Sequence, residues 1–282
     1  MVSLSHLPQA LQGRILVAGA GVSGLSIAKM LSELHCDVVV ADDNETARHM
    51  LIEVVDVADI STAQAQEQLD SFSIVVTSPG WRPTSTLLVD AHRQGLEVIG
   101  DVELAWRLDQ AGVFGEPHTW LAVTGTNGKT TTTSMLAAMM NEGGFTAKAV
   151  GNIGIPVSEA LVAKNRIDVL VAELSSFQLH WSPTFTPDAG VVLNLAEDHI
   201  DWHGSMSDYA LAKMEVLKGK VAIIGADDPY LVQLTSEADL SGLIGFTVNE
   251  PATGQLGVKA GELVDNAYGN NVVLASADGI NP

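Results

Sequence analysis

The chain of 282 residues lacks several features that would assign a protein to a class. Its single cysteine, Cys36, excludes a disulfide within the chain and indicates a small buried hydrophobe in a reducing compartment. No apolar run approaches the roughly 18 residues that span a bilayer. The first residues, MVSLSHLPQALQGR, also lack the apolar core of a signal peptide. These absences predict a cytoplasmic protein with no membrane partner.

Basic residues are scarce, since 14 Lys and Arg stand against 34 Asp and Glu and give a formal net charge of −20. So acidic a chain lacks the cations that displace counterions from nucleic acid, so no nucleic-acid partner is expected. Any anionic ligand would need local positive charge from a lysine, oriented amides or a divalent metal. With 46% apolar and 17% charged residues, the chain is globular, and its length suggests about two domains.

The most informative motif is TGTNGKTTT at residues 124–132, which follows the apolar run 120–123 and precedes a helical pattern at 131–141. A glycine-rich turn between a strand and a helix presents backbone N–H groups to a polyphosphate. Lys129 would reach the terminal phosphates, and the Thr130 hydroxyl would meet magnesium. Val123 stands where the general P-loop pattern has glycine. A threonine-capped glycine loop without a ligand is therefore the alternative.

Residues 13–41 read as strand, turn, helix and strand. The turn GAGVSG at 19–24 matches G-x-G-x-x-G, and Asp42 and Asp43 follow the second strand. This pattern predicts a Rossmann-like opening that binds a nucleotide phosphate, or else a tight turn that packs without a ligand. A further strand at 73–77 ends in Ser78-Pro79-Gly80, and another is expected at 95–99.

The predicted fold class is α/β, with a Rossmann-like parallel sheet domain at residues 1–100 and a P-loop ATPase-type α/β domain at 101–282. The second domain would contain helices at 101–109, 131–141 and 207–217. Its later strands would lie at 167–174, 189–195 and 220–225. Beyond Ser241, short strands and glycine turns predict a small antiparallel piece.

Polar residues follow two strands of the second domain. ELSSFQ closes the strand that ends at Glu173, and NLAEDHIDWHG at 194–204 closes the next. If these strands share a sheet with the phosphate loop, Glu173 and His199 would face Thr130 across a magnesium site. The alternatives are a solvated Glu173, a capping or core His199, a solvated Lys213 on DYALAKMEVL, and a loop shaped by Asp201 and His203.

The ordered motifs GTNGKTT, GNIG at 151–154, ELSSFQL, NLAEDHIDWHG and YALAK resemble those of the Mur ligases. The resemblance covers essentially all 282 residues, including GAGVSG and SPG, and ELSSFQL resembles the D-glutamate-adding branch. It implies ATP-dependent amide formation in peptidoglycan synthesis with ATP and Mg²⁺. ATP would phosphorylate the alanyl carboxylate of UDP-N-acetylmuramoyl-L-alanine, and D-glutamate would displace the phosphate. The protein would position the reactants, neutralise charge and act as a monomer.

The resemblance also implies roles for individual residues. The catalytic set would be Lys129, His199 and Lys213, the last matching a lysine that the family carbamylates. The metal ligands would be Thr130, Glu173, His199 and carbamylated Lys213. The ATP loop would be Gly125, Thr126, Asn127, Gly128, Lys129, Thr130 and Thr131. The UDP-muramoyl substrate would contact Gly21, Val22, Ser23, Asp42, Asp43, Ser78, Gly80, Asn152 and Ser175.

The chain departs from the family pattern in two places. Trp202 stands where the family often has arginine, and the chain stops at Pro282, where the family continues into a third domain that binds D-glutamate. The expectation is a truncated form that binds the UDP-muramoyl substrate and makes little product. The alternatives are a nicotinamide-dependent oxidoreductase, a non-catalytic nucleotide-binding module, and a related Mur or folylpolyglutamate-type ligase.

Overall fold

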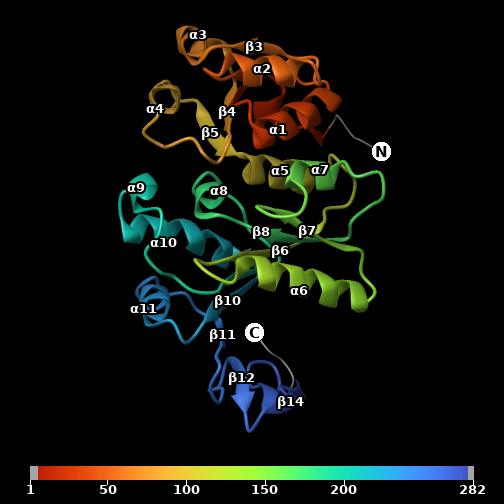
Figure 1. Ribbon diagram of the computed structural model, residues 1–282, viewed down its shortest axis with the longest axis vertical. Coiled ribbons are helices and arrows are strands. Elements are labelled where there is room, and N and C mark those ends of the chain that lie inside the picture. The colour runs from red at the N-terminus through yellow and green to blue at the C-terminus, as the bar shows by residue number, and fades with distance from the viewer. Residues whose placement is uncertain (1–5, 279–282) are drawn as a thin grey trace.

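The computed structural model describes residues 6–278 and contains two sheets arranged along the long axis of the molecule (Figure 1). The first sheet is wholly parallel, in the order β3-β2-β1-β4-β5. Its strands are β1 (Ile15–Ala18), β2 (Val38–Ala41), β3 (Ala58–Ile60), β4 (Ile74–Thr77) and β5 (Glu97–Gly100). The helices around it are η2 (Gln9–Leu11), α1 (Val22–Glu33), α2 (Glu45–Ile52), α3 (Thr62–Glu67), η3 (Leu69–Ser71) and α4 (Thr86–Arg93).

The second sheet has the order β14-β13-β12-β11-β10-β9-β6-β8-β7. Its strands are β6 (Thr119–Thr124), β7 (Ala147–Gly151), β8 (Val169–Glu173), β9 (Ala189–Val192), β10 (Val221–Gly225), β11 (Ile244–Phe246), β12 (Gln255–Lys259), β13 (Glu262–Asp265) and β14 (Val272–Ser276). Its helices are α5 (Asp101–Gln110), α6 (Lys129–Glu142), α7 (Val157–Leu161), α8 (Ser176–His180), α9 (Ile200–His203), α10 (Met206–Met214), η4 (Glu215–Lys218) and α11 (Pro229–Glu237).

The strand order places the predicted motifs at neighbouring strand ends. β1 lies between β2 and β4, and β6 lies between β9 and β8. Val123 of β6 is in register with Glu173 of β8 on one side and with Val191 of β9 on the other. The expectation that these three strands share one sheet is therefore confirmed. Ligands of open parallel sheets bind at such edges, where the strand order reverses.

Helices α5 and α7 lie between the two sheets in Figure 1 and join them. α7 packs against both α5 and α1, and the Ser26 and Ser158 hydroxyl oxygens are 2.5 Å apart across this contact. β5 ends at Gly100 and α5 begins at the next residue. The domain boundary expected there stays a prediction.

Several elements differ from the expectations. α1 begins at Val22 and α6 at Lys129, so both helices start inside the glycine-rich turns. The expected helix 207–217 ends as an α-helix at Met214 and continues as the 3-10 turn η4. The expected antiparallel piece is confirmed in β12–β14, which form the small lobe at one end of Figure 1. Parallel pairing through β11 joins this lobe to the main sheet.

The single thiol, expected to be a small buried hydrophobe, is only partly buried. Cys36 is half-buried against the core, and burial raises its pKa to about 11, which leaves an unreactive thiol at neutral pH. Within residues 6–278, no helix combines the length and apolarity needed to cross a membrane.

Candidate active site

The phosphate loop has the backbone shape that a glycine-rich turn allows. Gly125 and Gly128 have φ values of 153° and 82°, which other residues rarely adopt, and Gly128 caps the N-terminus of α6. The first N–H groups of α6 therefore face out of the loop without helical partners. The Lys129 ammonium donates to the carbonyls of Gly125 and Thr126, each at 3.0 Å.

Asn194, which sequence reasoning did not single out, holds this loop to the end of β9. Its Oδ1 accepts from Asn127 N at 2.9 Å, and its Nδ2 donates to Asn127 O at 3.1 Å. Thr126 makes a further tie, because its hydroxyl accepts from Ala196 N at 2.9 Å. A polar residue two positions after a parallel strand is the signal that could have identified Asn194.

Lys213 is buried beneath the phosphate loop, so the solvated alternative is wrong. Its side chain is 2% exposed, and its ammonium donates to Gly125 O at 3.0 Å and lies 4.8 Å from the centre of the Tyr209 ring. Lys129 donates to the same Gly125 carbonyl. Burial, reinforced by the Lys129 charge, lowers the pKa of Lys213 to about 7.

Glu173 is also buried, at 1% exposed, so the solvated strand-end alternative is wrong. Its Oε1 accepts from Asn152 Nδ2 at 2.9 Å. Its Oε2 is shielded from solvent and has no hydrogen-bond partner within the described chain. Buried polar atoms normally have partners, so a buried carboxylate oxygen without a hydrogen bond is suited to bind a cation.

His199 has a φ of 52° at the N-terminus of α9, and its ring lies 4.7 Å from that of Phe177. Its side chain is half-exposed beside Asp198, with Nε2 and Oδ2 3.4 Å apart. His203 instead lies next to Ser176 at 2.9 Å. Burial, with the nearby His180, lowers the pKa of His203 to about 4, so this imidazole is neutral at physiological pH.

A small cavity of about 140 Å³ gathers these segments. Its lining consists of Lys129, Asn152, Ser175, Ser176, Phe177, Asp198, His199, Tyr209 and Lys213. Glu173 adjoins it through Asn152, whereas Thr130 lies exposed on the first turn of α6. Over residues 6–278, no three His, Cys, Asp or Glu side chains cluster as a metal site. A magnesium ion would therefore depend on nucleotide phosphates as well as protein ligands.

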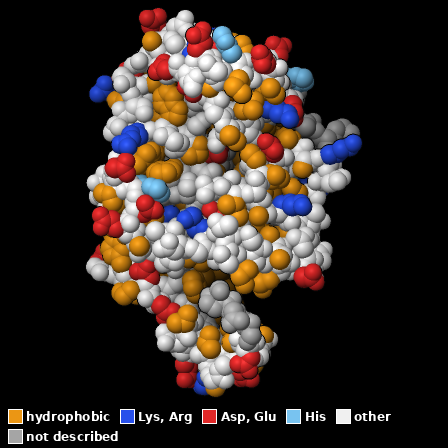
Figure 2. Space-filling view, viewed as in Figure 1, with side chains coloured by type: hydrophobic (Ala, Val, Ile, Leu, Met, Phe, Trp, Pro, Cys, Tyr) orange, Lys and Arg blue, Asp and Glu red, His pale blue; other side chains and the backbone are white. Residues whose placement is uncertain are grey.

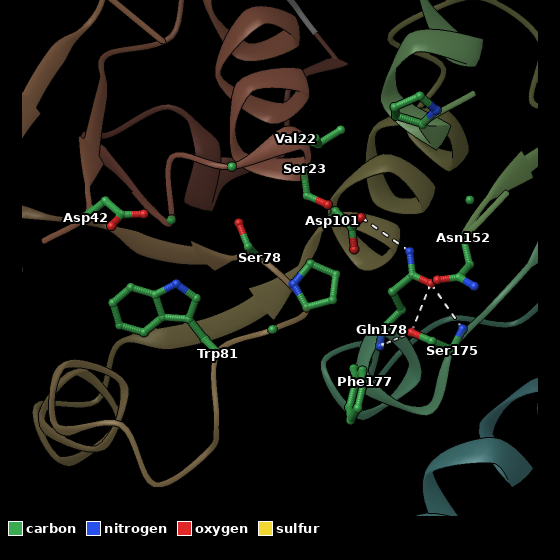
Figure 3. A pocket seen from close by; sticks show the side chains of 16 residues that line it. Val22, Ser23, Asp42, Ser78, Trp81, Asp101, Asn152, Ser175, Phe177 and Gln178 are labelled. Carbon is green, nitrogen blue, oxygen red and sulfur yellow. Dashed lines mark hydrogen bonds between the residues drawn. The ribbon is translucent and has the colours of Figure 1, made fainter. Parts of the chain in front are cut away.

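A larger cavity of about 470 Å³ lies between the two sheets (Figure 3). The first sheet lines it with Gly19, Gly21, Val22, Ser23, Asp42, Ser78, Pro79, Gly80 and Trp81. The opposite wall is formed by Asp101, Gly151, Asn152, Pro156, Ser175, Phe177 and Gln178. Asn152, Ser175 and Phe177 line both cavities, so the two spaces meet at one wall.

The structure separates the predicted substrate residues into two groups, those that line the larger cavity and one that does not. Eight of the nine line the larger cavity, namely Gly21, Val22, Ser23, Asp42, Ser78, Gly80, Asn152 and Ser175. Asp43 is outside it and accepts from Thr62 Oγ1 at 2.6 Å. Asp42 lines the cavity, but its carboxylate accepts from the backbone N–H groups of Ala20 and Asn44 at 2.8 and 2.9 Å. It therefore also holds the glycine-rich turn in shape.

Trp202, where the sequence departs from the family pattern, belongs to an aromatic cluster. Its ring lies 4.8 Å from Phe177 and 5.1 Å from His180. The preceding residue, Asp201, accepts from Arg82 Nη2 at 2.8 Å and so ties α9 to the loop after β4. Trp202 thus supports the Phe177 wall by packing rather than by charge.

Family models match both parts of the chain. Residues 13–100 match the Mur ligase MurD-like N-terminal domain, and residues 123–278 match the Mur ligase middle domain. A Corynebacterium efficiens protein named UDP-N-acetylmuramoylalanine--D-glutamate ligase is 70% identical over the whole chain. The chain spans 59% of that relative's length. A protein of the same name from Corynebacterium diphtheriae is 54% identical over 98% of this chain, which spans 59% of that protein. Another from Mycobacterium avium is 47% identical over 94% of this chain, which spans 54% of that protein.

Solved structures show a related fold at low sequence identity. The ligase MPL from Neisseria meningitides, titled UDP-N-acetylmuramate:L-alanyl-gamma-D-glutamyl-meso-diaminopimelate ligase, aligns with a TM-score of 0.54 at 18% identity. That alignment covers 91% of this chain and 85% of the other. MurC from Thermotoga maritima aligns with a TM-score of 0.50 at 21% identity, covering 86% of this chain and 54% of that one. Because the middle-domain model matches more than half of its residues, the chain belongs to the Mur ligase family.

Proposed function

We propose that this chain provides the UDP-substrate and ATP sites of an ATP-dependent ligase that joins D-glutamate to UDP-N-acetylmuramoyl-L-alanine. The observation that carries the proposal is the wall shared by the two cavities, formed by Asn152, Ser175 and Phe177. A UDP-linked substrate in the larger cavity would end at this wall, beside a nucleotide on the phosphate loop. The names of the relatives support the same reaction.

The reaction requires an activated carboxylate. One oxygen of the alanyl carboxylate attacks the γ-phosphorus of ATP, and ADP leaves. The amine of D-glutamate then attacks the acyl carbon, the phosphate leaves with the carboxylate oxygen, and the nitrogen loses a proton. Lys129 neutralises charge on the transferred group, and Asn152 and Ser175 orient the carboxylate end of the substrate.

Magnesium would be held by Glu173 and His199, together with Thr130 and nucleotide phosphates. The unpartnered Glu173 Oε2 fits this role. Bound magnesium would neutralise phosphate charge. Lys213, whose pKa is lowered to about 7, has a substantial neutral fraction at physiological pH. A neutral amine can add to CO₂ as a carbamate, which would turn this buried cation into an oxygen ligand.

The nicotinamide alternative is less favoured, because it leaves the phosphate loop and the small cavity lined by Lys129, His199 and Lys213 without a role. The related-ligase alternative differs in the amino acid added. A non-catalytic binding module would show the same two binding sites without ligand-dependent phosphate release. Phosphate release that requires both the UDP-muramoyl substrate and D-glutamate separates these alternatives.

Calorimetric titration of the chain and two variants tests the two-site arrangement. Lys129→Ala should weaken ATP binding at least tenfold and leave UDP-N-acetylmuramoyl-L-alanine binding within about twofold, since Lys129 lines only the small cavity. Lys148→Ala, on the exposed side of β7, is the matched control and should change neither affinity. Failure of the unmodified chain to bind either ligand, or NADH binding that UDP does not displace, would refute the proposal.

A further inference from the structure

Asp101 occupies an unusual place at the seam between the two sheets. It is the first residue of α5, directly after β5, and it lines the larger cavity where the two walls meet. In Figure 3 its carboxyl group lies between Ser23 of α1 and Gln178 of α8. Sequence reasoning assigned no role to it, because an aspartate at a helix start is an ordinary feature.

The two carboxyl oxygens of Asp101 have different environments. Oδ2 accepts from Gln178 Nε2 at 3.4 Å. Oδ1 is shielded from bulk solvent and has no hydrogen-bond partner among residues 6–278. Burial raises the pKa of Asp101 to about 6. Such a desolvated acceptor is unfavourable unless something else supplies a donor.

The Gln178 amide cannot turn to supply a second donor. Its Oε1 accepts from both N and Oγ of Ser175, at 3.1 and 3.2 Å, in the capping box of α8. This fixes Nε2 toward Asp101 and links Asp101 through Gln178 to Ser175 on the shared wall (Figure 3). Gln178 therefore cannot satisfy Oδ1, and the cavity that Asp101 lines is where a ligand would supply a donor.

We propose that Asp101 Oδ1 accepts a hydrogen bond from a hydroxyl or amide N–H of the sugar portion of the ligand in the larger cavity. This inference rests on the proposed function. The glycine-rich turn would hold the diphosphate at one end, and Ser175 and Asn152 would hold the carboxylate end. Asp101 lies between them, where an amino sugar presents hydroxyl and acetamido donors.

A second buried atom supports ligand recognition in this cavity. Ser78 Oγ is likewise shielded and without a hydrogen-bond partner in the described structure, and it lines the same cavity from the end of β4. Two such atoms on opposite walls indicate a space shaped for a polar ligand rather than a packing gap.

Asp101→Asn is the sharpest substitution because it keeps the shape of the side chain. The asparagine can offer its oxygen to Gln178 or to the ligand, but its NH₂ group then faces the other donor. Binding of UDP-N-acetylmuramoyl-L-alanine should weaken about tenfold, while binding of UDP, which lacks the amino sugar, should change less than twofold. Calorimetry of the 282-residue chain measures both affinities.

Asp90→Asn is the matched control. Asp90 also accepts from a glutamine amide, Gln66 Nε2 at 2.7 Å, but it lies on α4 outside the cavity. This variant should bind both ligands as the unmodified chain does. Equal weakening of UDP and the UDP-sugar by Asp101→Asn would indicate a structural role and overturn the inference. Unchanged sugar binding would also overturn it. Failure of the unmodified chain to bind the UDP-sugar would instead refute the proposed function itself.

Proton release provides a readout that a structural role would not change. A ligand donor stabilises the ionised carboxylate, so binding near pH 6 should release a fraction of a proton from the unmodified chain. Titrations in two buffers of different ionisation enthalpy measure this release. The Asp101→Asn variant should release fewer protons on binding, by that same fraction. Equal proton release by both proteins would contradict the inference.

Discussion

Lys213 shows how burial changes the chemistry of a single side chain. Its ammonium shares the Gly125 carbonyl with Lys129, and its pKa is lowered to about 7. The unfolded chain holds a proton on this lysine up to about pH 10, whereas the folded chain loses it near pH 7. The unfolded state therefore binds more protons between these values, and Lys213 makes the free energy of unfolding rise with pH across this window.

We therefore predict that Lys213→Met removes a pH dependence rather than a fixed increment. Between about pH 7 and about pH 9.5, the rise in unfolding free energy attributable to Lys213 should be a few kcal/mol and should be absent from the variant. Urea unfolding of both proteins at the two pH values measures it. Equal pH dependence in the two proteins would show that Lys213 titrates normally in the folded state.

Asp42 illustrates a residue whose place was predicted from sequence but whose contacts were not. Its position after β2 predicted a contact with the substrate, and it does line the cavity. Its hydrogen bonds, however, are to the N–H groups of Ala20 and Asn44. Sequence spacing gives the position at a strand end, but it cannot say whether backbone or ligand donors reach the carboxylate.

Asp42→Ala should therefore lower stability as well as ligand affinity. Loss of both acceptors leaves the part-buried N–H of Ala20 without its partner, whereas water can reach the exposed N–H of Asn44, so the cost should be about 1 kcal/mol of unfolding free energy. Asp42→Asn keeps one oxygen acceptor, so its unfolding free energy should lie between those of the unmodified chain and Asp42→Ala. Urea unfolding and UDP titration are measured on the same samples. Lost UDP affinity at unchanged stability would favour the direct substrate contact expected from sequence.

At the scale of elements, the strands and helices that flank recognisable turns were predictable, whereas α2, α4, α11 and several shorter elements were not. The strands before the two glycine-rich turns and the helices after them were all expected, because runs of apolar residues bounded by turn residues identify them. β7, α8 and α9 have only four or five residues each, so they give no clear periodicity. They nevertheless contribute Gly151 and Phe177 to the cavity wall and position His199.

The entry to α1 gives a test of the glycine-rich turn. A Cβ on Gly24 would lie 1.8 Å from Gly19 O, whereas a Cβ on Gly21 would meet nothing within 4 Å. Gly24→Ala must therefore displace α1 from β1, at a cost of about 3 kcal/mol in unfolding free energy. Gly21→Ala should keep its stability within about 0.5 kcal/mol and weaken UDP binding, because its methyl group enters the cavity lining.

Thermal unfolding and UDP titration of the two glycine variants measure these effects. The matched pair separates the packing role of one glycine from the ligand-approach role of the other. Similar loss of stability in both variants would show that the turn requires glycine at Gly21 for folding. Unchanged UDP affinity in a stable Gly21→Ala protein would place the ligand away from this turn.

At the scale of the whole molecule, the cavity between the sheets could not be predicted from the sequence. The motifs predicted which strand ends carry polar residues, and eight of the nine expected substrate residues do line one space. The relative orientation of the two sheets depends on packing among α1, α5 and α7, including the contact between Ser26 and Ser158. Ser26 and Ser158 are 132 positions apart, and α5 and α7 are separated by β6, α6 and β7, so no local pattern specifies these contacts. Asp101 and Gln178 were missed for this reason.

The charge distribution of the whole molecule leads to a final prediction about association rates. The net charge is −20, and acidic side chains lie at both ends of the face shown in Figure 2. The 16 residues that line the larger cavity include Asp42 and Asp101 but no Lys or Arg. An approaching anion therefore meets a repulsive field until it reaches the oriented N–H groups of the glycine-rich turn.

Salt should weaken this repulsion, because the screening length falls from about 30 Å near 10 mM salt to about 8 Å near 150 mM. The association rate of UDP should thus rise about two- to threefold over this range, the reverse of the usual behaviour of electrostatically attracted ligands. Stopped-flow fluorescence can follow binding, since Trp81 lines the cavity. Uncharged uridine is the control and should show no such rise. A UDP association rate that falls with salt would mean that the lysines around the neighbouring small cavity, Lys129 and Lys213, control the field at the entrance despite the overall charge.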